Sequence, residues 1–225
     1  MTKVKKSSIL LTCLLLALLC GLLFYIDGNA SKYIIRITRL CAINIVLALS
    51  MNLVNGFTGI FSLGHAGFMA IGAYTVALLT IPVAKKETIF MLEPLIAPLN
   101  TLTLPFGAAL IIGGLLAAAL AFLIGLPCLR LRGDYLAIAT LGFSEIIRIV
   151  ITNAQSLTNG AQGLKSIPAT ANIWWCYGIA LATIVFIALL ISSSYGRAFK
   201  AIREDEIAAE SMGVSLLRHK MLSFM

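Results

Sequence analysis

Charged residues are scarce in this chain of 225 residues. Only 12% of the residues are charged, whereas 60% are hydrophobic and the mean hydropathy is +1.00. Soluble globular domains carry about 25% charged and about 45–50% apolar residues, so the composition argues against a soluble domain of any fold. Apolar runs of about 20 residues, the length that a helix needs to cross the hydrocarbon layer, indicate an integral membrane protein.

Motifs for nucleotide hydrolysis and metal binding are also missing. The chain has no GxxxxGK[ST] phosphate loop, because residues 163–166 (Gly-Leu-Lys-Ser) lack the glycine before the lysine. It has no HExxH motif, and its two histidines, His65 and His219, lie in different segments. We therefore expect no ATP hydrolysis, no metal and no cofactor, so active transport would draw its energy from a partner or an ion gradient.

No CxxC pair occurs among the five cysteines, which all lie in or beside apolar stretches. This placement favours buried apolar side chains over metal ligands. The cysteines are Cys13, Cys20, Cys41, Cys128 and Cys176.

The apolar segments predict an all-α, polytopic transmembrane bundle with six spans, forming a single domain over residues 1–225. The uncharged run of residues 9–26 is longer than the 7–15-residue apolar region of a signal peptide. This length favours an uncleaved first helix over a signal peptide cleaved near residues 28–30. The other five spans are expected over residues 33–54, 65–83, 105–126, 135–151 and 173–191. Residues 221–225 predict the start of a seventh helix, and hence a chain truncated at its C-terminus.

A polar, glycine-rich stretch without charge, residues 55–64, separates the second span from the third. Irregular backbone at membrane depth is tolerated only where it is buried in protein or lines a cavity. We therefore expect a broken or re-entrant stretch here, with its backbone satisfied by Asn52, Asn55, Thr58 and Ser62. His65 follows, and either contacts a solute or caps exposed backbone where the third helix starts.

The fifth expected span contains two ionisable residues, Glu145 and Arg148. Such residues are costly in lipid and are functional candidates, and their spacing of three places them on one helix face where they can pair. They either line a translocation path or form a structural pair with Arg148 reaching the outer interface. The path candidates are Asn52, Asn55, Ser62, His65, Glu145 and Arg148.

Lys and Arg outnumber Asp and Glu by 17 to 9. In a membrane protein this surplus indicates topology rather than nucleic-acid binding, because basic residues collect on the cytoplasmic side. With six crossings and a cytoplasmic N-terminus, ten of the 17 lie inside: Lys3, Lys5, Lys6, Arg130, Arg132, Arg197, Lys200, Arg203, Arg218 and Lys220. The aromatic residues Trp174, Trp175 and Tyr177 mark an interface at the start of the sixth span.

Small residues recur at intervals of three or four in two spans, which favours close helix packing. One stripe comprises Gly113, Ala117, Ala121 and Gly125, and the other comprises Ala66, Ala70, Ala73 and Ala77.

The longest charged stretch is residues 192–220. A helical projection of residues 197–212 gives an apolar side of small residues, which Asp205 interrupts, and Gly213 predicts the end of the helix. Such a helix suits either docking into a cleft of another protein or lying among lipid headgroups.

Three ordered blocks resemble the membrane permeases of branched-chain amino acid ABC importers. The first is residues 52–59 (Asn-Leu-Val-Asn-Gly-Phe-Thr-Gly) with residues 62–68 and 72–74. The second is residues 133–143 (Gly-Asp-Tyr-Leu-Ala-Ile-Ala-Thr-Leu-Gly-Phe) with Glu145 and residues 158–168. The third is residues 195–213, from Tyr-Gly-Arg to Ser-Met-Gly.

The resemblance implies a subunit without enzymatic activity. In the family, two permease chains form the pathway, two cytoplasmic ATPase subunits drive it, a periplasmic binding protein delivers the solute, and further helices follow the third block. That block corresponds to the segment that couples to the ATPase, with the expected coupling residues Gly196, Arg197, Arg203, Glu206, Ala208, Ala209 and Gly213. Here the Glu-Ala-Ala core is interrupted by Ile207.

The expected function is the transport of leucine, isoleucine and valine across the bacterial inner membrane. Urea permeases share much of the first two blocks, so a urea or short-chain amide importer is one alternative. An ion-coupled secondary transporter with a titrating Glu145 is a second, and a membrane scaffold without transport is a third.

Overall fold

The computed structural model describes residues 6–90, 94–97, 99–131 and 133–225, with side chains from residue 14 onward. Lys3, Lys5 and Arg132, and the side chains of Lys6 and Cys13, lie outside the described part. Within the described ranges the regular secondary structure is entirely helical, as predicted.

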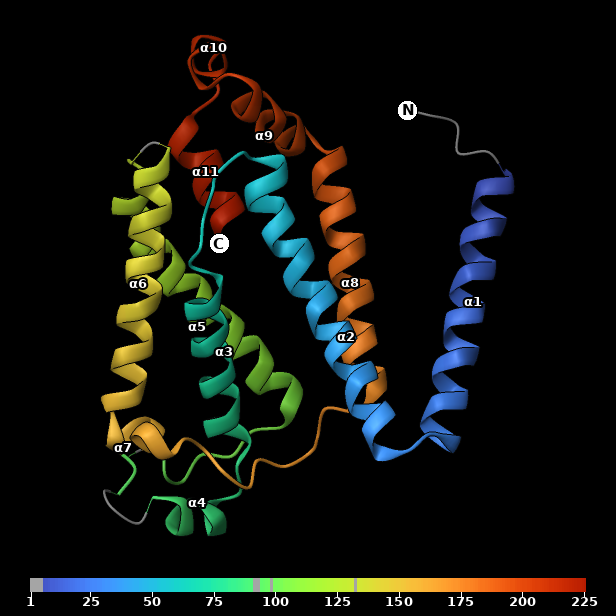
Figure 1. Cartoon of the computed structure of the whole chain (residues 1–225), viewed down its shortest axis with the longest axis vertical. Coiled ribbons are helices and arrows are strands. Elements are labelled where there is room, and N and C mark those ends of the chain that lie inside the picture. Colours follow the sequence, from blue (N-terminus) through green and yellow to red (C-terminus); the bar gives the residue numbers. More distant parts are fainter. Residues whose placement is uncertain (1–5, 91–93, 98, 132) are drawn as a thin grey trace. The chain divides into compact units, whose positions relative to one another are not determined.

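Each of the six predicted spans corresponds to a long helix (Figure 1). The long helices are α1 (Lys6–Asn29), α2 (Lys32–Met51), α3 (His65–Thr80), α5 (Phe106–Cys128), α6 (Asp134–Asn153) and α8 (Ile173–Ser192). The π-helical turn η1 (Asn52–Phe57) extends α2. The shorter elements are α4 (Val83–Ile89), α7 (Gln155–Thr158), η2 (Gly160–Gln162), α9 (Ser194–Glu204), α10 (Glu206–Ser211) and α11 (Leu216–Phe224).

Four helices in the described residues are long and apolar enough to cross a membrane: Lys32–Phe57, Phe106–Cys128, Asp134–Asn153 and Ile173–Ser192. A fifth span results if α3 and α4, which are bent by 119° at the residues between them, are counted together. The described side chains of α1 give only a shorter apolar stretch, Leu14–Asn29. A polytopic helical membrane protein is thus confirmed, while the count of six spans plus a seventh stays a prediction.

The chain divides into two compact units, and the residues of the candidate site lie in the second. The first unit comprises Met1–Ala48 and Ala171–Ile184, and the second comprises Leu49–Thr170 and Val185–Met225.

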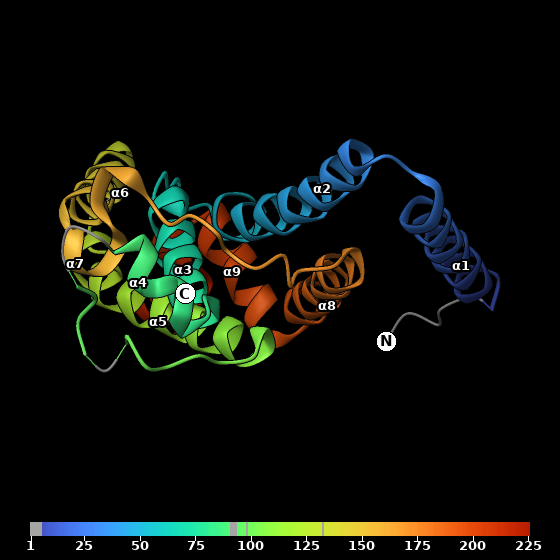
Figure 2. The ribbon, with the colours of Figure 1, turned by 90° about the horizontal axis from the view of Figure 1, so that it is seen from below.

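The core of the second unit forms where α3, α5, α6 and α11 meet, and Figure 2 shows α3, α5 and α6 grouped together. Its buried apolar side chains are Val54, Ile60, Ala121, Ile124, Cys128, Leu129, Leu136, Met221 and Phe224. The last two belong to α11, which begins at Leu216, earlier than the predicted helix start at residue 221. The apolar end of the charged stretch is therefore a core element.

The small-residue stripe of α5 is a packing face, as predicted, because Gly113, Ala121 and Gly125 are buried. A Cβ atom at Gly113 would lie 2.9 Å from Val76 Cγ2 and 3.2 Å from the carbonyl oxygen of Gly72. The backbones of α3 and α5 can approach this closely only without a side chain at residue 113.

The stripe predicted on α3 is largely wrong, because Ala66 and Ala73 are exposed and only Ala77 is buried. The small residue that α3 does use is Gly67, which faces α6, whereas a Cβ atom at Gly72 would meet nothing within 4 Å. A Cβ atom at Gly67 would lie 3.1 Å from the Cα atom of Ser144. The close packing of α3 against α6 therefore depends on Gly67 rather than on the alanines.

Lys86 on α4 is 1% exposed, although it belongs to a connection that the sequence marks as charged. Its Nζ atom donates hydrogen bonds to the carbonyl oxygens of Leu99 and Leu102, both at 2.7 Å. Buried charged groups must be hydrogen-bonded to be tolerated. Lys86 thus fastens the connection between α4 and α5 to α4.

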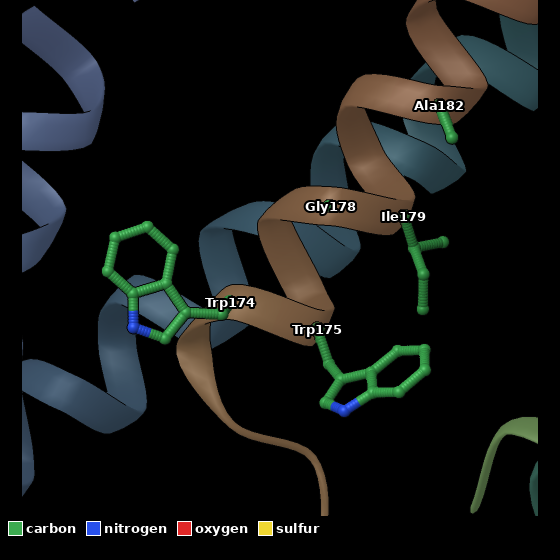
Figure 3. Close-up of a pocket in the computed structure, with 5 residues that line it drawn as sticks. All are labelled: Trp174, Trp175, Gly178, Ile179 and Ala182. Carbon is green, nitrogen blue, oxygen red and sulfur yellow. The ribbon is translucent and has the colours of Figure 1, made fainter. Parts of the chain in front are cut away.

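In the first unit, Trp174 and Trp175 lie in the first turn of α8, where the aromatic belt was predicted. Figure 3 shows their rings projecting to opposite sides of the helix, with Ile179 and Ala182 on the side of Trp175. Both tryptophans are about half exposed, as suits side chains at a membrane interface.

The prediction of buried cysteines is correct for Cys128 and wrong for Cys20 and Cys41. The latter two are exposed on α1 and α2. Cys176 is half-buried.

We predict that Gly113→Leu lowers the stability of the protein, because the new side chain has no space between α5 and α3. Overpacking of this kind costs about 1–3 kcal/mol. Gly114→Leu is the matched control, because a Cβ atom at Gly114 meets nothing within 4 Å. Thermal unfolding of both variants in detergent tests this prediction, and equal losses of stability would contradict it.

Candidate functional site

The chain is interrupted between α2 and α3, as predicted, but the interruption is shorter than residues 55–64. Residues 55–57 are still helical, because η1 continues α2 as far as Phe57. Residues 58–64, here called the break, are irregular, with Thr58 and Gly64 in the αR region and Gly59 at φ +74°, and burial alternates along them. Thr58, Ile60 and Ser62 are at most 3% exposed, whereas Phe61 is 55% and Leu63 38% exposed. The break thus inserts alternate side chains into the core.

Polar side chains satisfy the backbone of the break. The Asn55 side-chain oxygen accepts a hydrogen bond from the amide of Ser62 at 3.3 Å, and the Ser62 hydroxyl accepts one from the amide of Gly64 at 3.3 Å. The Thr58 hydroxyl donates to the carbonyl oxygen of Leu53 at 3.1 Å. The predicted role of these three residues is confirmed, while Asn52 packs its side-chain oxygen against Gly56.

Thr140 on α6 is a further partner, which the sequence analysis missed. Its hydroxyl accepts a hydrogen bond from the amide of Leu63 at 3.1 Å and donates one to the carbonyl oxygen of Ala137 at 3.0 Å. Thr140 is 1% exposed. The only signal in the sequence is a threonine in an otherwise apolar stretch, and the pairing with residue 63 depends on the tertiary fold.

His65 is the first residue of α3 and is half-buried, so its predicted place at the start of the helix is confirmed. Its role on a solute path stays a prediction. The predicted pairing of Glu145 and Arg148 is confirmed, because Arg148 Nη2 lies 2.5 Å from Glu145 Oε1 and Arg148 Nε donates to both carboxylate oxygens. Both side chains are more than half exposed, and within the described residues no hydrogen bond joins them to the break.

The charged segment, defined from here on as residues 194–224, contains α9, α10 and α11, and the first two take the place of the single helix expected over residues 197–212. The helix is broken at Asp205, whose backbone is extended with φ −156° and ψ 112°. The Asp205 carboxylate accepts hydrogen bonds from the amides of Ile207 at 2.8 Å and Ala208 at 3.0 Å. Asp205 is therefore the N-cap of a new helix, α10, and this explains why it interrupts the apolar side of the projection.

Two glycines shape the ends of this segment. Gly213 has φ +84° and follows α10, whose predicted end there is confirmed. Gly196 is required by close approach, because a Cβ atom there would lie 2.1 Å from the carbonyl oxygen of Ile191. The turn from α8 into α9 therefore has no space for a side chain at residue 196, while Arg197 beside it is exposed.

Helix α9 packs against the end of η1 and against the break. Arg203 Nη1 donates a hydrogen bond to the carbonyl oxygen of Gly56 at 3.1 Å, and its guanidinium group also pairs with Glu204. Lys200 Nζ lies 5.9 Å from the centre of the Phe57 ring. Gly59, with φ +74°, is so close to α9 that a Cβ atom there would lie 3.1 Å from the Cα atom of Arg203. The charged segment is thus in direct contact with the discontinuity in the chain.

Helix α10 forms an exposed tip. Ala209 faces inward and is 5% exposed, whereas Ile207 is 71% and Met212 86% exposed. Ala208 is also exposed. Glu206, in the first turn, pairs with Lys220 of α11 at 2.6 Å. The tip thus presents two large apolar side chains, Ile207 and Met212, beside the charged residues of α9 and α10.

The structure thus brings the coupling candidates of α9 together with the path candidates near the break. In Figure 1, η1 and helices α9, α10 and α11 gather at one end of the second unit. The described residues contain no group of three or more His, Cys, Asp or Glu that could hold a metal ion.

These features define a polytopic helical membrane protein with a broken span and an exposed charged segment packed on the break. Residues 33–225 match the family described as the branched-chain amino acid transport system, permease component. The chain belongs to this family, and the resemblance of its three blocks is confirmed.

The chain is 37% identical over 228 residues to the high-affinity branched-chain amino acid transport system permease protein LivM of Escherichia coli (strain K12), covering 86% of this chain and 49% of that protein. The LivM protein of Salmonella typhimurium is 36% identical with the same coverage. A probable branched-chain amino acid transport permease protein LivM of Methanocaldococcus jannaschii is 24% identical over 206 residues, covering 77% of this chain and 57% of that protein. The chain therefore spans about half the length of the curated relatives it matches, and no solved structure matches it.

We predict that Gly59→Ala destabilises the protein more than Gly213→Ala. Both glycines have positive φ near +80°, where an alanine costs about 1–2 kcal/mol. At Gly213 a Cβ atom meets nothing within 4 Å, whereas at Gly59 it meets Arg203. The added overpacking at Gly59 costs about 1–3 kcal/mol more.

The free energies of unfolding of the two variants in detergent test this prediction. Equal losses would show that α9 does not press on the break.

Proposed function

We propose that this chain is a membrane-spanning permease subunit of an ABC importer that moves branched-chain amino acids across the inner membrane. Family membership and relatives named for branched-chain amino acid transport support the class and the solute. The observation that carries the mechanism is the position of α10, whose exposed Ile207 and Met212 stand beside a segment that packs on the break.

In this proposal the tip of α10 docks onto an ATPase subunit in the cytoplasm. Ile207 and Met212 fill a cleft of that subunit, while Ala208 keeps the outer face of the helix shallow and Arg197 meets the partner from the exposed side of α9. Gly196 and Gly213 set the turns that present α9 and α10. The partner subunit hydrolyses the ATP, because this chain has no motif for nucleotide hydrolysis.

Movement of α9 reaches the break through Arg203, whose guanidinium group holds the carbonyl oxygen of Gly56. A displaced α9 changes the contacts of Gly59 as well, since nothing separates the two backbones there. We propose that this exchange of contacts opens and closes a solute path beside Asn52, Asn55, Ser62 and His65.

The complete importer would contain two ATPase subunits, a second permease chain, a periplasmic solute-binding protein and the surrounding membrane lipid. The N-terminus would be cytoplasmic, which follows from the charge bias and places the charged segment on the side of the ATPase. Glu145 and Arg148 form a neutral pair at the surface of α6 and would face either the path or a neighbouring helix.

The first test is the uptake of labelled leucine into vesicles that contain the complete protein with its ATPase, second permease and binding-protein partners. We expect uptake that depends on ATP and is blocked by excess isoleucine but not by urea. Competition by urea would instead identify an amide importer. Uptake that needs only an ion gradient and collapses with a protonophore would contradict the proposal.

A second test addresses docking at α10. We predict that Ile207→Asp weakens binding of the ATPase subunit about tenfold or more, because loss of a hot-spot anchor from an interface costs about 2 kcal/mol or more. Ile167→Asp is the matched control, because Ile167 is also half exposed and lies before α8, away from α10 in sequence and topology. Co-purification of the ATPase subunit measures the difference, and equal retention with both variants would contradict docking at α10.

A further inference from the structure

We propose that Lys220 is a positioning residue that acts through Glu206, so that the ion pair between them passes movements of α10 to α11 and to the core beside the break. The proposal rests on the proposed function and adds a second connection, distinct from the contact of Arg203 with Gly56.

The geometry of the pair supports this role. Lys220 Nζ donates to Glu206 Oε1 at 2.6 Å across 14 residues of sequence. The side chain of Lys220 is 7% exposed, whereas that of Glu206 is 40% exposed. A buried ammonium group is tolerated only with a partner, so Lys220 depends on Glu206 more than Glu206 depends on Lys220.

Few other groups fasten α10 to the rest of the chain. The side chains of Asp205 and Ser211 bond within α10 itself, since Asp205 caps it and the Ser211 hydroxyl donates to the carbonyl oxygen of Ile207. Within the described residues, the Glu206–Lys220 pair is the one side-chain hydrogen bond from α10 to another helix. The extended backbone at Asp205 and the turn at Gly213 flank α10 on both sides, so both of its ends are connected through non-helical residues.

The other end of the connection lies in the core. Met221 and Phe224 follow Lys220 on α11 and are 6% and 9% exposed. The Phe224 ring packs edge-on against Phe68 of α3, with 5.5 Å between ring centres. Both side chains also press on Gly125 of α5, where a Cβ atom would lie 2.9 Å from Met221 Sδ. A shift of α11 therefore changes the packing of α3 immediately after the break.

This arrangement gives Glu206 a role inside the chain. The resemblance assigns Glu206 to ATPase coupling, which would be expected of a side chain that faces the partner. In the structure its carboxylate instead holds the buried ammonium group of the same chain. The two roles differ in one consequence: only the internal role requires Lys220.

The experiment uses the complete importer in vesicles and measures leucine taken up per ATP hydrolysed. Lys220→Met is the key variant, because a methionine suits the buried site and removes the link without leaving a buried charge. We expect this variant to keep its thermal stability and its bound ATPase subunit but to lose about tenfold in uptake per ATP, within the range of typical coupling between sites. An unchanged ratio would overturn the proposal.

Charge reversal provides the second readout. Glu206→Lys alone should uncouple transport, and the double variant Glu206→Lys with Lys220→Glu should recover at least half of the lost ratio because the pair is restored in reverse. Recovery would not occur if Glu206 acted by touching the ATPase subunit. The matched control is Arg218→Glu, which reverses a charge on α11, the helix of Lys220, at an exposed residue that forms no ion pair among the described residues.

The unaltered importer separates this proposal from the proposed function. If it shows no ATP-dependent uptake of leucine, the proposed function fails. If it transports leucine but Lys220→Met is fully coupled and the double variant shows no recovery, the proposed function stands and the role of Lys220 is refuted.

Discussion

The backbone between α2 and α3 is not helical, although the chain consists mainly of apolar helices. Its amide and carbonyl groups lack helical partners, and each therefore needs another partner inside the protein. The structure meets this constraint with side chains from several elements. Asn55 and Ser62 bond to amides of the break, and Thr140 reaches it from α6. The arrangement of α3, α6 and α9 around the break follows from this need, since each supplies either a hydrogen bond or a close backbone contact.

The same constraint explains how a local event can have a distant effect. The end of η1 and the break also contact the charged segment, because the Gly56 carbonyl oxygen accepts from Arg203 and Gly59 lies against the backbone of α9. We propose that the break responds when α10 is displaced, because its backbone is held by side-chain hydrogen bonds rather than by a continuous helix.

Much of the fold follows from sequence, and the exceptions have clear physical causes. Long apolar runs predict the helices, and glycine with asparagine predicts the break, because these signals are local. The burial of Lys86, the partnership of Thr140 with Leu63 and the Glu206–Lys220 pair join residues that only tertiary packing brings together. The prediction of a single helix over residues 197–212 is wrong, because a helical projection does not show that an aspartate can cap the start of a new helix. Asp205 takes that role.

We propose that displacement of α10 by an ATPase subunit changes the break. Hydrogen exchange of the amides in residues 58–64, measured in the assembled importer with and without ATP, tests it directly. The account predicts that protection of the Ser62, Leu63 and Gly64 amides changes together with that of α10, because these amides bond to Asn55, Thr140 and Ser62 in the state described here. A change in α10 with constant protection of the break would contradict the account.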